Sequence, residues 1–204
     1  NTKIAGLETG FSQRLLAATK ESALGVDDVS KLKGLEQAQI DAAAKAAQER
    51  GLSGKWVLSL QNTTQQPALA SLDDRSTREA LFRKGWTRAE NGGKNDTRAG
   101  LEELAQLRAQ KAKLLGYSDY ASFVLYDQMA KTPSDATGFI ARLMPATAAN
   151  QKQEAADLQK LIKDSGQDFT LKPWDWTYYA DRLKKQRFDL DAAQLRPYFE
   201  LNTV

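Results

Sequence analysis

Five aromatic side chains near the end of the chain are the residues best suited to recognition chemistry. Half of the ten Trp and Tyr residues fall between residues 174 and 198. They are Trp174, Trp176, Tyr178, Tyr179 and Tyr198. Surface aromatics bind ligands through their ring faces and their NH or OH groups, whereas aromatics spaced along a helix more often pack in a core. Packing is the more frequent outcome, and both interpretations stay open at this point.

The chain has neither histidine nor cysteine, which excludes most catalytic chemistry. Ser-His-Asp and Cys-His mechanisms both need a histidine, so neither can form within this sequence. Zinc sites are built mainly from His and Cys, and a site made of carboxylates alone is rare. The sequence also has no EF-hand loop and no glycine-rich phosphate loop. We therefore expect no catalytic residue and no metal ligand in this chain.

The composition is that of a globular protein. The apolar fraction is 41% and the charged fraction is 27%, and 204 residues suffice for one large domain or two small ones. A net charge of +3 does not predict a nucleic-acid partner. No apolar run approaches the roughly 18 residues that cross a membrane, and no signal peptide is visible. The absence of cysteine fits both cytoplasm and periplasm, so the compartment stays undecided.

Helical periodicity dominates the pattern of apolar residues and predicts a mainly α fold. Helices are expected at 2–22, 36–50, 67–86, 96–115, 118–129, 132–162 and 173–187. The helix expected at 132–162 should bend at Pro145 into two arms. In the 67–86 helix, Leu81, Phe82 and Trp86 are expected on the inner side. Residues 55–60 form the one convincing strand, whereas 25–28 and the glycines at 92–93 are expected in loops. No repeat or linker divides residues 1–204, which predicts a single helical unit.

The final long helix should contact other structure on two sides. At 100° per residue, Trp174 and Tyr178 share one side. The opposite side carries Trp176, Tyr179, Ala180 and Leu183. Asp175 lies in the first turn, where a structural role is expected, with its carboxylate accepting from backbone amides or a tyrosine. Lys184, Lys185 and Arg187 are interpreted as a solvated face, with Asp181 paired to Lys185.

The segments Lys172–Ala180, Phe188–Asp191 and Leu195–Phe199 together resemble the thimet-oligopeptidase-like zinc metallopeptidases. Three further stretches agree with that family and occur in the expected order. They are Gly54–Asn62, Leu107–Ala121 and Met129–Pro133. The first of these, with the second tryptophan at Trp176, is similar to the bacterial dipeptidyl carboxypeptidase branch.

This resemblance implies a two-lobed, neurolysin-like helical fold that faces a deep channel with zinc at its floor. It implies an enzyme that hydrolyses short peptides and releases C-terminal dipeptides. The family's zinc ligands lie in an H-E-x-x-H helix and at a downstream glutamate, and none can be placed on a chain without histidine. Residues 1–204 would thus be part of the non-catalytic lobe and channel wall. Their partners would be the zinc-bearing lobe of the same polypeptide and, through the whole enzyme, short peptides.

Four side chains are candidates for contact with a bound peptide in that channel: Trp174, Tyr178, Gln65 and Gln66. The segment alone is expected to be inactive and to bind no zinc. Two alternatives stay open, namely another oligopeptidase of the same family and a non-enzymatic helical interaction module on the same scaffold. A basic RNA-binding domain is a third option that the near-balanced charge does not favour.

Overall fold

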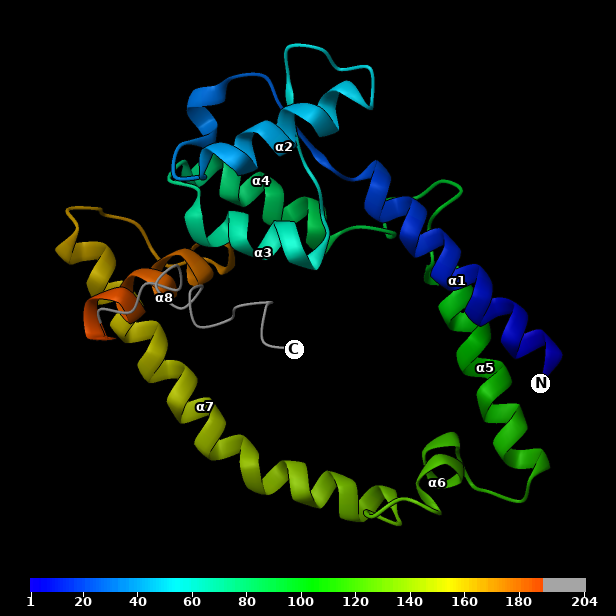
Figure 1. The fold of residues 1–204 in the computed structure, drawn as a ribbon. Coiled ribbons are helices and arrows are strands. Elements are labelled where there is room, and N and C mark those ends of the chain that lie inside the picture. Colours follow the sequence, from blue (N-terminus) through cyan, green and yellow to red (C-terminus); the bar gives the residue numbers. More distant parts are fainter. Residues whose placement is uncertain (189–204) are drawn as a thin grey trace, which may run out of the picture. The chain divides into compact units, whose positions relative to one another are not determined.

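The computed structural model describes residues 1–188, apart from the side chains of residues 62–64 and 66. The helices are α1 Thr2–Glu21, α2 Gln37–Gln48, α3 Asn62–Ser71, α4 Arg75–Trp86, α5 Arg98–Leu114, α6 Tyr120–Leu125, α7 Pro133–Asp164 and α8 Pro173–Phe188 (Figure 1). The strands are β1 Leu24–Val26 and β2 Trp56–Leu58, and Val29–Leu32 forms a 3₁₀ helix. The mainly α fold class is therefore confirmed.

Contacts divide the chain into two compact units. The first consists of residues 1–23 and 84–153, and the second of residues 24–83 and 154–204. Both unit boundaries after residue 24 fall inside helices, α4 and α7. The single helical unit expected over residues 1–204 stays a prediction. Among the described residues, no helix combines the length and the apolar character needed to cross a membrane.

The first unit is built around the pairing of α1 with α5, which lie side by side (Figure 1). Two ion pairs join their exposed edges, Lys3 to Glu103 at 2.6 Å and Arg108 to Glu8 at 2.7 Å. Between the helices a small cavity of about 90 Å³ is lined partly by glycines of both. Helix α6 packs on α5, where the Arg108 guanidinium lies 5.4 Å from the Tyr120 ring centroid and the Lys111 ammonium lies 5.2 Å from that of Phe123.

The second unit has two apolar cores. One lies between the small sheet and helices α2 to α4 and contains Val26, Leu32, Ala43, Leu58, Leu60, Ala68, Leu69, Leu72 and Leu81. Gly34 borders it in a left-handed conformation, φ +96°, and a Cβ there would lie 2.0 Å from the Ser71 carbonyl oxygen. The other core joins the end of α7 to α8 through Leu158, Ile162 and Tyr179. Helix α8 thus packs on α7 and, on its other side, on α3, as the two aromatic stripes predict.

Several helix-end signals act as expected. Thr132 accepts from the amide of Asp135 at 3.1 Å, while its hydroxyl donates to that carboxylate, so this pair caps α7. Gly51 and Gly116 follow α2 and α5 with φ of +71° and +84°. The start of α6 differs from the prediction. Asp119, rather than Ser118, accepts from the amide of Ser122, and the helix ends at Leu125 instead of Met129.

The expectation of one strand is wrong, because residues 24–26 form a second. Leu24 pairs with Leu58 and Val26 with Trp56 in an antiparallel ladder. The loop prediction rested on Gly25 and the aspartates that follow. Pairing prevails because Val26, 5% exposed, contributes to the core that the ladder closes.

The 67–86 helix is in fact two helices. Helix α3 begins at Asn62, so Pro67 lies inside it rather than at its start. Burial of Leu69 and Leu72 offsets the one backbone bond that the proline removes. The Asp74 carboxylate then accepts from the amide of Thr77 at 2.8 Å and caps the separate helix α4. Hydrogen bonds from Ser76 and Thr77 lower the pKa of Asp74.

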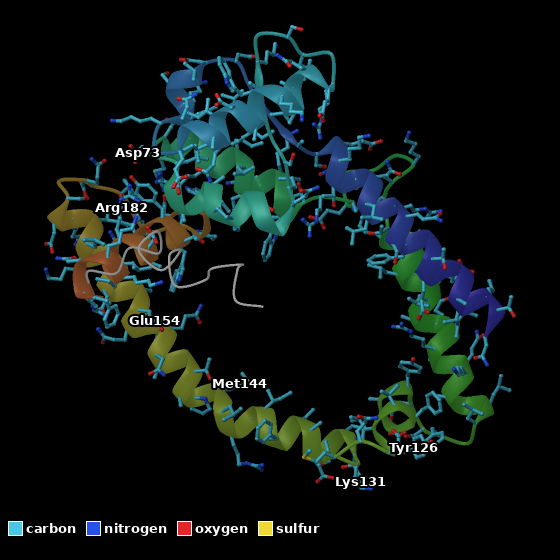
Figure 2. The ribbon with its side chains drawn as sticks, viewed as in Figure 1. Asp73, Tyr126, Lys131, Met144, Glu154 and Arg182 are labelled. Carbon is cyan, nitrogen blue, oxygen red and sulfur yellow. The ribbon has the colours of Figure 1, made fainter. Side chains whose placement is uncertain are left out.

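Two further expectations need correction. Trp86, predicted on an inner side, is 75% exposed, because it stands in the last turn of α4. Helix α7 runs unbroken through Pro145, so the two arms expected on either side of the bend belong to one helix. The axis of α7 does curve beside Met144, as a proline requires (Figure 2).

Candidate functional site

Asp175 is the buried centre of the interface between α8 and the start of α4. Its carboxylate has no solvent exposure and receives donors from three directions. Arg75 donates from Nε and Nη2 at 3.0 and 2.8 Å, and Arg78 donates from Nη2 at 3.3 Å. The amide of Lys172 adds a bond of 3.1 Å and closes the first turn of α8. The hydrogen bond to Asp175 is also the main cause that raises the pKa of Arg75.

Arg78 is as deeply buried as its carboxylate partner, with 1% of its surface exposed. Its Nη1 donates to the carbonyl oxygens of Leu72 and Asp73 at 2.7 and 3.1 Å, so it also fastens the turn that separates α3 from α4. The guanidinium carbon lies 3.9 Å from the centroid of the Tyr178 ring. Nε is buried and has no hydrogen-bond partner among the described residues. Arg78 therefore depends on Asp175 for its countercharge.

A second, partly exposed cluster lies one turn further along α8. The Tyr178 hydroxyl and Arg182 Nη2 both donate to Asp73 Oδ1 at 3.0 Å. The Arg182 guanidinium also lies 3.3 Å from the centroid of the Tyr178 ring. Figure 2 places Asp73 and Arg182 next to each other. Burial raises the pKa of Tyr178 first of all, and the nearby positive charge of Arg182 opposes that shift.

Trp174 occupies the outer part of the same interface. Its ring lies 6.4 Å from that of Phe82, and the guanidinium of Arg83 lies 4.9 Å from its centroid. The indole nitrogen is buried and has no acceptor among the described residues. Trp174 is half-buried, so part of its ring surface faces outward. Cation–π contact with α4 fixes the ring without a hydrogen bond.

The four predicted peptide-contact residues are not all brought together. Trp174 and Tyr178 lie on the same side of α8 and both contact α4 arginines. Gln65 is half-buried in α3 and donates to the carbonyl oxygen of Leu81 at 3.4 Å, which ties α3 to α4. Gln66 also belongs to α3, and its side chain lies outside the described part. Contact of any of them with a peptide stays a prediction, as does any role of Tyr198, which lies outside the described residues.

The structural role expected for Asp175 agrees with its contacts, and the partners differ in part. A backbone amide does donate to it, but the tyrosine of the interface donates to Asp73 instead. The two arginines were not anticipated. Arg75 and Arg78 are three residues apart in α4, a spacing that places both side chains on one helix face. That spacing is the feature of the sequence from which a shared carboxylate partner could have been predicted.

On the basic face of α8, the expected pair of Asp181 and Lys185 is present at 3.0 Å. Arg187 is exposed but not free, since it pairs with Asp157 of α7 at 2.5 Å. Its role is therefore to join α7 and α8 as well as to face solvent.

An apolar groove of about 370 Å³ lies elsewhere in the second unit, between α2 and β2. Ala38, Ala42 and Ala46 of α2 form one wall, and Val57 and Leu58 line the other. Of the candidates whose side chains the structure describes, Trp174, Tyr178 and Gln65, none lines it. Its lining also includes the polar residues Glu36, Gln39 and Ser59.

The donor atoms do not suit zinc. The sequence contains no histidine or cysteine, and the described residues contain no group of three acidic side chains placed to hold a metal ion. The charged residues of the α4–α8 interface are instead paired with one another. These pairs hold α8 against α4, and part of the Trp174 ring surface faces outward.

Known proteins of one family match this chain. Residues 68–204 match the family described as peptidase family M3. Over 204 residues the chain is 50% identical to dipeptidyl carboxypeptidase of Escherichia coli (strain K12) and 47% identical to that of Salmonella typhimurium. It is 31% identical to oligopeptidase A of Escherichia coli over 205 residues. The matches cover 100, 100 and 98% of this chain but 30% of each relative.

The chain thus spans about 30% of the length of the curated relatives that it matches. The family match begins inside α3 and includes both arginines of α4 and the whole of α8. It covers more than half of the sequence, and the family expected from the residues is confirmed. The chain belongs to peptidase family M3.

Proposed function

We propose that this chain is a segment of a zinc metallopeptidase that removes dipeptides from the C-termini of short peptides. One observation carries the proposal. The similarity to dipeptidyl carboxypeptidases, at 50 and 47% identity, extends over the whole chain. It therefore includes residues 1–67, which the family match does not reach.

The difference in identity between relatives favours this branch over the alternative of a general oligopeptidase. Oligopeptidase A of Escherichia coli shares 31% of residues with the chain, against 50% for dipeptidyl carboxypeptidase of the same strain. Both comparisons span nearly all of the chain, so the lower value does not come from a shorter alignment.

Within the longer enzyme, the segment serves as support and channel wall rather than as a source of catalytic groups. The buried Asp175 and Arg78, together with the half-buried Arg75, fix α8, and α8 carries the aromatic side chains of Trp174 and Tyr178. Peptide substrates and the zinc-bearing lobe are the proposed partners. Zinc is the proposed cofactor of the longer enzyme, and its ligands are not in this chain.

A chimera tests this function. The 204 aligned residues of Escherichia coli dipeptidyl carboxypeptidase are replaced by this chain. The assay follows dipeptide release from an N-blocked tetrapeptide with a free C-terminal carboxylate, with the C-terminally amidated peptide as the control. We expect a folded chimera that hydrolyses the free acid and spares the amide.

The matched control is the 204-residue chain alone, which we expect to release no dipeptide with or without added zinc. A chimera that folds cooperatively but cleaves nothing would contradict the proposal and favour a helical interaction module. Zinc-dependent dipeptide release by the chain alone would contradict the supporting role assigned to this segment.

A further inference from the structure

The loop that joins α4 to α5 contains Asn91-Gly92, and no other asparagine of the sequence precedes a glycine. In such a pair, the amide nitrogen of the second residue can attack the side-chain carboxamide of the first. Glycine allows the close approach because it has no Cβ. The pair is therefore a chemically reactive point in a chain that otherwise offers few.

The loop is open to water around both residues. Asn91, Gly92 and Gly93 are exposed, and a Cβ built on Gly92 would meet nothing within 4 Å. The loop is held at its base, since Thr97 donates to the carbonyl oxygen of Ala89 from its amide at 2.9 Å. Solvent can therefore reach the reacting atoms while the loop ends stay in place.

The N–H of the attacking nitrogen is already hydrogen-bonded to an ionised carboxylate. The amide of Gly92 donates to Asp96 Oδ2 at 2.8 Å. Arg98 Nη2 contacts the same oxygen at 2.6 Å, and the hydrogen bonds from Arg98 lower the pKa of Asp96, which is ionised at neutral pH. The carboxamide of Asn91 is itself tied to the carbonyl oxygen of Thr87 at 2.8 Å.

We propose that Asn91 is a site of spontaneous deamidation and that the Asp96 carboxylate restrains its rate. Gly92 N loses its proton to water and attacks Cγ of Asn91. A ring C–N bond forms, the Cγ–Nδ2 bond breaks, and ammonia leaves. Water then opens the succinimide at either carbonyl to give an aspartyl or an isoaspartyl residue, with no change of oxidation state.

Asp96 slows the reaction because it opposes the charge that the first step creates. The attacking species is an amide anion, and a negative charge 2.8 Å from that nitrogen raises the free energy of the anion. The product carries a new carboxylate between Glu90 and Asp96, and the isoaspartyl form lengthens the loop backbone by one carbon. Restraint by Asp96 thus protects the connection between α4 and α5.

The experiment compares the wild-type chain with Asp96→Asn, Arg98→Gln and Asn91→Gln in mildly alkaline buffer. Trypsin releases Ala89–Lys94, which contains Asn91 and no other asparagine, and Leu143–Lys152, whose Asn150 precedes glutamine and is the internal control. Mass spectrometry follows the gain of about one dalton, and an isoaspartate assay identifies the product.

We expect a slow gain in the wild-type Ala89–Lys94 peptide, none in Asn91→Gln and none at Asn150. Asp96→Asn should accelerate the gain by about tenfold for each unit by which the carboxylate raises the amide pKa. Arg98→Gln loosens the loop but keeps the carboxylate, so its rate should not exceed that of the wild type. If the Ala89–Lys94 peptide stays unmodified in every variant, Asn91 is not a deamidation site. Equal acceleration by Arg98→Gln and Asp96→Asn overturns the role of the carboxylate.

Discussion

Replacing Asp175 by asparagine should strongly destabilise the second unit. The variant keeps the size of the side chain but leaves Arg78, 1% exposed, without a countercharge. Removing one partner of a buried ion pair costs about 3–5 kcal/mol. Arg78 retains the carbonyl oxygens of Leu72 and Asp73 and the ring of Tyr178, so we expect about 3 kcal/mol, the lower end of that range.

The same reasoning predicts that Arg78 contributes more to stability than Arg75, although Arg78 makes the longer bond to Asp175. Arg75 makes the shorter bonds to Asp175, 2.8 and 3.0 Å against 3.3 Å for Arg78. Its side chain is nevertheless 34% exposed, and when it is removed Asp175 still receives hydrogen bonds from Arg78 and from the amide of Lys172. Arg75→Met should therefore cost about 1 kcal/mol, close to the value of an exposed pair. Coupling to Asp175 should be larger for Arg78.

Urea unfolding monitored by tryptophan fluorescence measures these losses in the free energy of unfolding. Three of the four tryptophans, Trp56, Trp174 and Trp176, belong to the second unit. With a slope of about 2 kcal/mol per molar urea, a loss of 3 kcal/mol lowers the midpoint by about 1.5 M. The double variant Asp175→Leu with Arg78→Met should recover part of that loss. Asp175→Asn within about 1 kcal/mol of wild type, or strictly additive single effects, would refute the reasoning.

Three further predictions concern other positions. Gly6→Ala should stabilise α1 by about 0.5–1 kcal/mol, since a Cβ there meets nothing within 4 Å. Gly34→Ala should destabilise the fold by about 2–4 kcal/mol, because its Cβ would lie 2.0 Å from the Ser71 carbonyl oxygen. Opposite shifts in melting temperature check both. Lys131→Gly should stabilise by about 1 kcal/mol because Lys131 has φ +59°, and an unchanged urea midpoint would argue against that strain. The raised pKa of Tyr178 favours the neutral phenol in the fold, so its contribution is present below pH 10 and is lost as pH rises through the higher folded value. Wild type should lose more stability than Tyr178→Phe in that alkaline range, and parallel pH profiles would contradict this.

Local signals in the sequence were sufficient for most of the helices. Apolar periodicity located α1, and periodicity together with helix-end residues located α2, α5 and α8, because those features act within one or two turns. The ladder between residues 24–26 and 56–58 depends on pairing across thirty residues, and no local pattern reports it. The start of α3 at Asn62 was missed because Pro67 was taken as the first residue of a helix, whereas it lies inside one.

The interface of α8 was predictable in outline but not in its partners. The aromatic stripes indicated contact on two sides, and the first-turn position of Asp175 indicated a structural role. The identity of its partners required knowing that α4 lies against α8, a contact between residues about one hundred positions apart. Once that contact is known, the spacing of Arg75 and Arg78 explains why both reach one carboxylate.

The products of the chimera test the proposed function most directly. Mass spectrometry of a peptide with a free C-terminus, digested by the Escherichia coli enzyme carrying this chain in place of its own 204 aligned residues, reads out which bond is cut. We predict successive loss of intact dipeptides from the C-terminus, with the amidated peptide left whole. Cleavage of the amidated peptide at internal bonds, by a chimera that folds as the parent does, would contradict a dipeptidyl carboxypeptidase.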